Sequence, residues 1–146
     1  LEGPTLLAQL LAGADEQALR DAGALLAELH DRLHRIPTMG GGPGTIVHLD
    51  LHPDNVMMTP DGPMVIDWAN GADGPAELDV AMTWVVMEPV VQVFPEARPL
   101  LDGFLDAAGR DLAHRGLRAA CDRRLADPNA TESERSAIAT LRATAT

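Results

Sequence analysis

The fold of this chain is decided by a twenty-residue stretch, HLDLHPDNVMMTPDGPMVID, which runs from His48 to Asp67. Two apolar runs in it, Val56–Met58 and Met64–Ile66, flank a turn signal at Pro60-Asp61-Gly62. This pattern predicts a β-hairpin. The β-branched residues at 45–47 predict a short strand that leads into the stretch.

Polar side chains of this stretch have the composition of a cation site. His48, Asp50 and His52 alternate, so on an extended segment all three side chains would face one way. Asn55 follows a proline turn, and the hairpin would return Asp67 beside the first segment. Amide and carboxylate oxygens are ligands that a hard cation such as Mg²⁺ prefers. The stretch therefore predicts a hard-cation site, with Asp50 as a free carboxylate that could act as a base.

The flanking sequence is helical in pattern. A leucine stripe after Gly3-Pro4 predicts one helix, and apolar residues at alternating three- and four-residue steps predict a second from about 15 to 35. Downstream, helices are expected at about 75–87, 96–108 and 111–125, with a last one introduced by a capping box at Thr131. Segments 39–44 and 69–74 are rich in glycine and are expected to be a connector and a loop. The expected fold class is mostly α with a small central β-hairpin, in a single domain over residues 1–146.

Composition excludes several functions. The net charge of −11, from 22 acidic and 11 basic residues, argues against nucleic acid as a partner and would suit a cationic substrate. All basic residues are arginine, which excludes a Walker phosphate loop and the strand lysine of protein kinases. No apolar run approaches the length of a membrane span, so no membrane partner is expected. The lone Cys121 is expected to pack in a helix, and it fits a reducing, cytoplasmic location.

A family resemblance becomes visible at this point. The segment from His48 to Asn55 matches the H-x-D-x-x-x-x-N catalytic loop of the protein-kinase-like fold, and its HPDN ending resembles the aminoglycoside phosphotransferase and choline kinase superfamily. The tripeptide Ile66-Asp67-Trp68 resembles the I-D-W of that superfamily. Further similarities are found in LAELH (26–30), GPA (74–76), DVA (79–81) and EGPTL (2–6). The resemblance covers about residues 1–110.

The resemblance implies an enzyme and a set of roles. The chain would be the C-terminal lobe of a protein-kinase-like α+β fold and would transfer phosphate from ATP, with Mg²⁺, to a hydroxyl of a small molecule. Asp50 would accept or orient the hydroxyl proton, and His48 would orient the loop. Asn55 and Asp67 would hold Mg²⁺ against the ATP phosphates, while Asp79 would anchor the loop backbone.

The resemblance also implies divisions of the chain. Residues 1–36 would form helices, 45–67 the catalytic loop and metal-site hairpin, and 75–146 a helical substrate-side subdomain. The ATP-gripping N-terminal lobe is expected upstream of Leu1, which would make the chain a truncated lobe that is inactive alone. Its exposed interface would promote self-association. One departure concerns Leu49, since the family usually has glycine there, and this puts the local backbone geometry in doubt.

Two other functions remain open from the sequence. The chain could be a non-catalytic binding module, like a pseudokinase lobe. It could also be a metal-dependent hydrolase in which His48, Asp50 and His52 bind Zn²⁺ or a similar ion. The acceptor of a kinase reaction is left open as well, with acidic candidates at Glu88, Glu96, Asp102 and Asp106 that could attract an amine.

Overall fold

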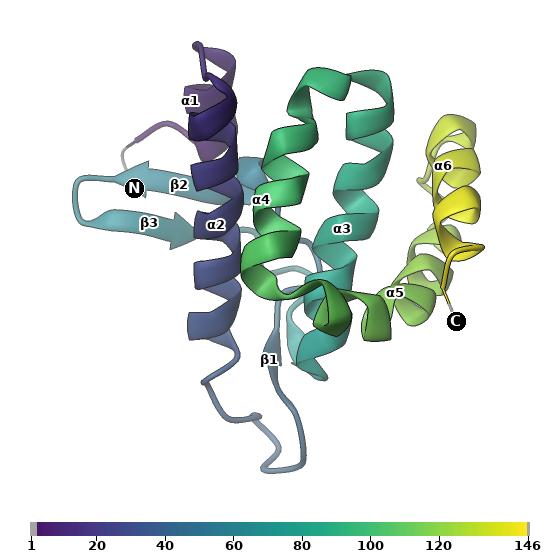
Figure 1. Cartoon of the computed structure of the whole chain (residues 1–146). Coiled ribbons are helices and arrows are strands. Elements are labelled where there is room, and N and C mark those ends of the chain that lie inside the picture. Colours follow the sequence, from purple (N-terminus) through teal and green to yellow (C-terminus); the bar gives the residue numbers. More distant parts are fainter. Residues whose placement is uncertain (1–2, 146) are drawn as a thin grey trace.

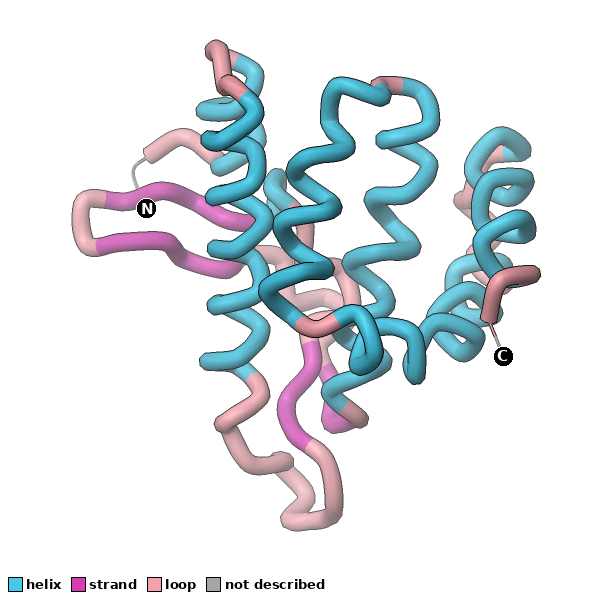
Figure 2. Tube along the Cα trace, viewed as in Figure 1, coloured by secondary structure: helices cyan, strands magenta, loops and turns pink. Residues whose placement is uncertain are grey.

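The computed structural model describes residues 3–145 and is dominated by helices (Figure 2). Leu1, Glu2 and Thr146 lie outside the described residues, and with them part of the 2–6 segment compared above. The helices are α1 (Leu6–Leu11), α2 (Glu16–Leu33), α3 (Ala76–Val93), α4 (Arg98–Ala108), α5 (Arg110–Leu125) and α6 (Glu132–Arg142). The strands are β1 (Thr45–Val47), β2 (Val56–Thr59), β3 (Gly62–Val65) and β4 (Ala72–Gly74), with short 3₁₀ turns at Pro53–Asn55 and Pro95–Ala97. The mostly α fold class with a central hairpin is confirmed.

Helix starts follow local capping chemistry. The side chains of Thr5, Asp15 and Thr131 each accept a hydrogen bond from a backbone N–H in the first turn of the helix that follows. Such caps satisfy donors that the helix itself cannot pair, and each contributes roughly 1 kcal/mol. Of these three caps, the one at Thr131 was predicted, and it is confirmed.

Helix α2 packs mainly on α4, and α3 mainly on α5, with α3 also against α4 (Figure 1). The first contact depends on two glycines. A Cβ at Gly23 of α2 would lie 2.2 Å from the Leu100 carbonyl oxygen, and one at Gly103 of α4 would lie 2.5 Å from that of Arg20. The two backbones therefore approach to a distance that no other residue type permits.

Gly23→Ala is expected to destabilise the chain by about 1–3 kcal/mol, because the added methyl must push α2 and α4 apart. Urea unfolding measures the change in free energy. Gly42→Ala is the matched control, since nothing lies within 4 Å of a Cβ there. Equal midpoints for the two variants would contradict this packing.

The β structure is larger than the predicted hairpin. Strands β2 and β3 form that hairpin, with Val56 opposite Val65. The 69–74 segment is not wholly a loop, because its end forms β4, antiparallel to β1, with Val47 opposite Ala72. Gly44 makes this possible, since a Cβ there would lie 2.7 Å from the Gly74 carbonyl oxygen. The hairpin and the strand at 45–47 are confirmed, whereas β4 and its pairing with β1 were not predicted.

Helix α3 also runs further than predicted, to Val93 rather than to about Met87. Pro89 lies inside it, where proline removes one backbone hydrogen bond. The helix continues because the following turn buries Val91, which is 2% exposed, in the core. Within residues 3–145, no helix is both long and apolar enough to cross a membrane.

Two clusters of buried side chains form the core, and α3 contributes to both. One joins α1, α2, α3, α4 and the hairpin, and the other joins β1, α3, α5 and α6. The segment after β1 runs between them, with Val47 and Leu49 in the second cluster and Leu51 in the first. The loop that follows β1 is thus fixed by buried apolar side chains that belong to both clusters.

Candidate active site

The loop after β1 is held by one carboxylate of α3. Asp79, which is fully buried, accepts hydrogen bonds from the backbone N–H of His48 at 3.1 Å and of Leu49 at 2.7 Å. One turn further along α3, the Thr83 hydroxyl donates to the Leu51 carbonyl at 2.6 Å. Residues four apart lie on the same face of a helix, so α3 presents both groups to the loop. The loop backbone is therefore fixed at three points, residues 48, 49 and 51.

The loop is not an extended segment, as the alternation argument assumed. Leu49 has φ of +68°, in the left-handed region that favours glycine. The cost for a residue with a Cβ is about 1–2 kcal/mol. Burial of the leucine side chain and the bond to Asp79 offset that cost. The expectation that His48, Asp50 and His52 face one way on an extended segment is therefore wrong at Leu49.

His48 connects the loop to the end of the hairpin. Its Nδ1 accepts from the Asp50 N–H at 3.1 Å, so Nε2 carries the proton and donates to the Ile66 carbonyl at 2.8 Å. Its ring also contacts the Trp68 ring edge-on, at 4.7 Å between centroids. Both ring nitrogens are occupied by these bonds. His48 therefore has no lone pair left for a zinc ion, which argues against the hydrolase interpretation.

Asp50 is a half-buried carboxylate of the loop. One of its oxygens lies 3.4 Å from His52 Nε2, and the other accepts from Asn55 Nδ2 at 3.3 Å. Partial burial works to raise the pKa of Asp50, but the neighbouring imidazoles, His52 first and then His48, outweigh it and leave the pKa below its usual value. Asp50 is thus ionised at neutral pH and can accept a hydrogen bond from a hydroxyl group.

Asn55 and Asp67 carry the oxygens that the sequence predicts as Mg²⁺ ligands. The Asn55 Nδ2 donates to the Asp50 carbonyl at 2.8 Å, which directs the other end of the amide, Oδ1, away from that bond. The Ile66 N–H donates to the Asn55 carbonyl at 2.9 Å, so the hairpin ladder continues to the residue before Asp67. An amide oxygen and a carboxylate are a donor set that fits Mg²⁺. The side chains of Asp50 and Asn55 are in contact. Asp67 directly follows Ile66, whose backbone N–H is bonded to the Asn55 carbonyl.

Sequence reasoning missed part of this machinery. His30 and His34 of α2 lie 3.4 and 2.8 Å from Asp79 Oδ2, and His30 Nε2 lies 2.8 Å from the Thr83 hydroxyl. His30 was noticed only as part of a family motif, and His34 and Thr83 were not considered. The signal was present, because residues 30 and 34 are one helical turn apart and 79 and 83 are too.

Acid is expected to destabilise the chain through this cluster. Burial lowers the pKa of His30 from its ordinary 6.5, although the nearby Asp79 raises it. Burial alone would raise the pKa of Asp79, but the hydrogen bonds it accepts, from His34 and the Leu49 N–H among others, outweigh burial and hold the pKa well below the usual 3.8. In both cases the unfolded chain binds its proton at a higher pH than the folded chain does, so acidification favours unfolding.

Urea unfolding in metal-free buffer should therefore show a free energy of unfolding that falls from pH 7 to pH 5 through His30, with a further fall below about pH 4 through Asp79. His30→Gln should remove the first fall, whereas His114→Gln should keep it. A stability that is flat over the upper range would contradict a buried neutral His30.

Comparison with known proteins agrees with this geometry. The chain is similar to thiamine kinases of Salmonella paratyphi B, Salmonella newport and Salmonella heidelberg, each 41% identical over 39 residues. These matches cover 27% of this chain and only 14% of each relative. The family model described as "Phosphotransferase enzyme family" matches residues 1–121. Since this match covers most of the chain and includes the whole loop and hairpin, the chain belongs to the phosphotransferase enzyme family.

Proposed function

We propose that the chain provides the catalytic loop and Mg²⁺ ligands for phosphoryl transfer from ATP to a hydroxyl of a small molecule. The observation that carries this proposal is the fixed loop: Asp79 holds its backbone so that Asp50 projects beside Asn55, with Asp67 following on the hairpin. Transfer of a phosphoryl group depends mainly on positioning and charge neutralisation, and a rigid loop of this kind supplies the positioning.

Each side chain has a distinct role in this proposal. Asp50 accepts the hydrogen bond of the acceptor hydroxyl and orients its oxygen toward the phosphorus. Its lowered pKa makes it a weak base, so orientation contributes more than early proton removal. Asn55 and Asp67 hold Mg²⁺, which when bound neutralises phosphate charge. His48 keeps the Asp50 and Asp67 segments together through Ile66. The chain contains no lysine, so a phosphate-binding lysine would have to come from outside these 146 residues.

An acceptor site is suggested by a groove that begins at the loop. The groove has a volume of about 690 Å³ and includes His52, Pro53 and Asp54 in its wall. The rest is mostly apolar and comes from α1, the end of α3 and the start of α4: Leu7, Leu10, Leu11, Val86, Val90, Phe94 and Leu100. Such a wall suits an acceptor with an apolar or aromatic body, and less well a sugar that is polar all round.

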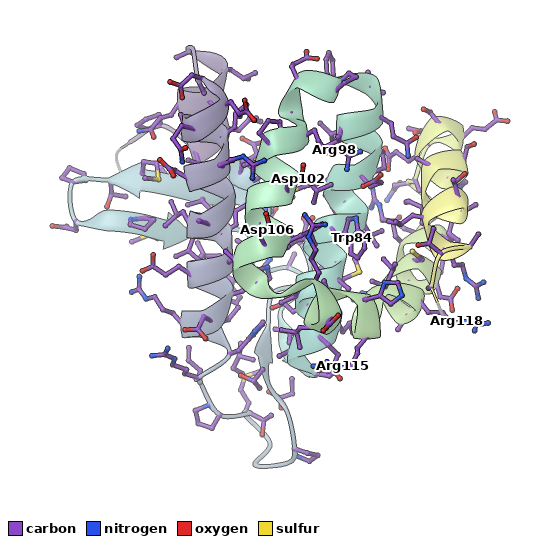
Figure 3. The ribbon with its side chains drawn as sticks, in the orientation of Figure 1. Trp84, Arg98, Asp102, Asp106, Arg115 and Arg118 are labelled. Carbon is purple, nitrogen blue, oxygen red and sulfur yellow. The ribbon has the colours of Figure 1, made fainter. Side chains whose placement is uncertain are left out.

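Ion pairs and the lining of the groove reduce the number of acidic side chains that could attract a cationic acceptor. Asp102 and Asp106, labelled on α4 in Figure 3, lie within 4 Å of the side chain of Arg110. Glu88 lies 3.5 Å from the side chain of Arg98. Of the four acids considered from the sequence, Glu96 lines the groove, together with Asp54 of the loop. Two carboxylates beside an apolar wall favour a cationic alcohol.

The proposal is tested by ADP release from the whole protein with Mg·ATP, over amino alcohols, amino sugars, macrolides and thiamine. One acceptor should give turnover that is lost on chelation of Mg²⁺. Thiamine belongs in the panel because it is the substrate named for the related kinases. If ADP is not released and Mg·ATP does not bind, a non-catalytic binding module becomes the better proposal, with the exposed apolar residues of the groove, Leu11 and Phe94 among them, as its contact surface.

A further inference from the structure

Three potential metal ligands converge beneath the catalytic loop, away from the Mg²⁺ ligands proposed above. They are the ring nitrogens of His30 and His34 and a carboxylate oxygen of Asp79, all within 4.8 Å of one another. Asp79 Oδ2 is 3.4 Å from His30 Nδ1 and 2.8 Å from His34 Nε2. Two histidines one helical turn apart with one carboxylate form a common ligand set for first-row transition metals.

The hydrogen positions around His30 leave a lone pair that points into this cluster. The Leu51 carbonyl can only accept, so the Thr83 hydroxyl donates its proton there, at 2.6 Å. The same hydroxyl must then accept from His30 Nε2, 2.8 Å away, so Nε2 carries the ring proton. The neutral form of the ring carries a single proton. Nδ1 is therefore unprotonated, and it is a buried side-chain nitrogen with no hydrogen-bond partner.

An unprotonated nitrogen facing a carboxylate oxygen is unfavourable, since both groups are acceptors. A cation between them removes the conflict. We propose that His30 Nδ1, His34 Nε2 and Asp79 form a binding site for a divalent transition metal of the zinc class, with water as the remaining ligand. The hydrogen bond from His30 Nε2 to Thr83 then corresponds to the outer bond that metal-binding histidines usually make.

The distance between His30 Nδ1 and Asp79 Oδ2 and the access to the cluster agree with this assignment. With metal–ligand bonds of about 2.0–2.1 Å, tetrahedral ligand atoms lie about 3.3 Å apart. The separation of His30 from Asp79 already matches, and His34 would have to withdraw by roughly 0.5 Å. His34 is the C-cap of α2 and is partly exposed, so its ring can move. A cleft of about 340 Å³ reaches both histidines, and Glu28 and Asp31 in its wall would attract a cation.

The site would act on the catalytic loop through a single side chain. Asp79 holds the His48 and Leu49 N–H groups, so a metal on Asp79 would fix the same carboxylate that positions Asp50. The inference does not depend on phosphoryl transfer, because it concerns metal binding alone.

Titration of the chelator-treated chain with Zn²⁺ by calorimetry tests the site, with Co²⁺ absorption reporting the ligand geometry. One Zn²⁺ per chain is expected, with visible cobalt bands typical of tetrahedral coordination. His34→Gln should weaken Zn²⁺ binding by more than about 10-fold. A loss of about 10-fold is already typical when only a residue that hydrogen-bonds to a metal ligand is removed. His114→Gln is the matched control and should bind as the unchanged chain does, and circular dichroism checks that both variants fold.

A second readout needs no variant. Nitrogen NMR of the unchanged chain should show the His30 and His34 ring signals shifting with one equivalent of Zn²⁺. The proposal is overturned if His34→Gln binds as tightly as the unchanged chain. It is overturned equally if the His30 and His34 ring signals do not respond to Zn²⁺, whatever the protonation of His30.

Discussion

Asp50→Asn is expected to lower the kcat of the whole protein by about 10²–10⁴-fold, the usual contribution of a positioned acid–base group. Asparagine has nearly the same shape and leaves the Asn55 bond to the backbone carbonyl of residue 50 in place. The fold and Mg·ATP binding should therefore persist while the hydroxyl loses its acceptor. Steady-state ADP release at saturating ATP measures the change.

The control for this variant is Asp61→Asn, in the exposed turn of the hairpin. Asp61 makes only a local backbone contact with Thr59 and should leave kcat unchanged. If Asp50→Asn keeps kcat within about threefold of the unchanged protein, the role assigned to Asp50 is wrong, because such a change corresponds to less than 1 kcal/mol of barrier.

Asp79→Asn is expected to destabilise the chain by about 3–5 kcal/mol, since it removes one partner of a buried charged network. The Asp79 oxygens accept from two backbone N–H groups and from His34. In asparagine, an NH₂ group replaces one of the two carboxylate oxygens. That group is a donor and would face one of these donors, so neither would have a hydrogen-bond partner. Urea unfolding gives the free energy, and hydrogen exchange at the His48 and Leu49 amides should accelerate.

Asp73→Asn provides the matched comparison. Asp73 also accepts from two backbone N–H groups, those of Met39 and Gly40, but these bonds are exposed to solvent. Its loss should cost about 1 kcal/mol or less. A similar cost for the two variants would mean that burial of Asp79 does not organise the loop.

Local signals account for what the sequence predicted well. The cap at Thr131 and the turn at 60–62 determine structure within a few residues, so the start of α6 and the hairpin were predicted. Strand β4 was missed because its pairing depends on the approach of Gly44 to Gly74, thirty residues away. No local pattern reports such a contact.

The same distinction applies to the site. The H-x-D-x-x-x-x-N spacing identified Asp50 and Asn55 because both lie on one loop. The left-handed backbone at Leu49 and the cluster of His30, His34 and Asp79 arise from α2 and α3 meeting that loop. Helical spacing indicates that residues 30 and 34 share one face of α2 and that residues 79 and 83 share one face of α3. That these two faces meet beneath the loop depends on tertiary packing, which the sequence alone does not reveal.

The most direct test of phosphoryl transfer is phosphorus NMR of the products after the whole protein reacts with Mg·ATP and the acceptor found by ADP release. The account predicts a phosphate ester of the acceptor, formed in step with ADP and absent with Asp50→Asn. Inorganic phosphate as the sole product, or ester formation at an undiminished rate without the Asp50 carboxylate, would contradict it.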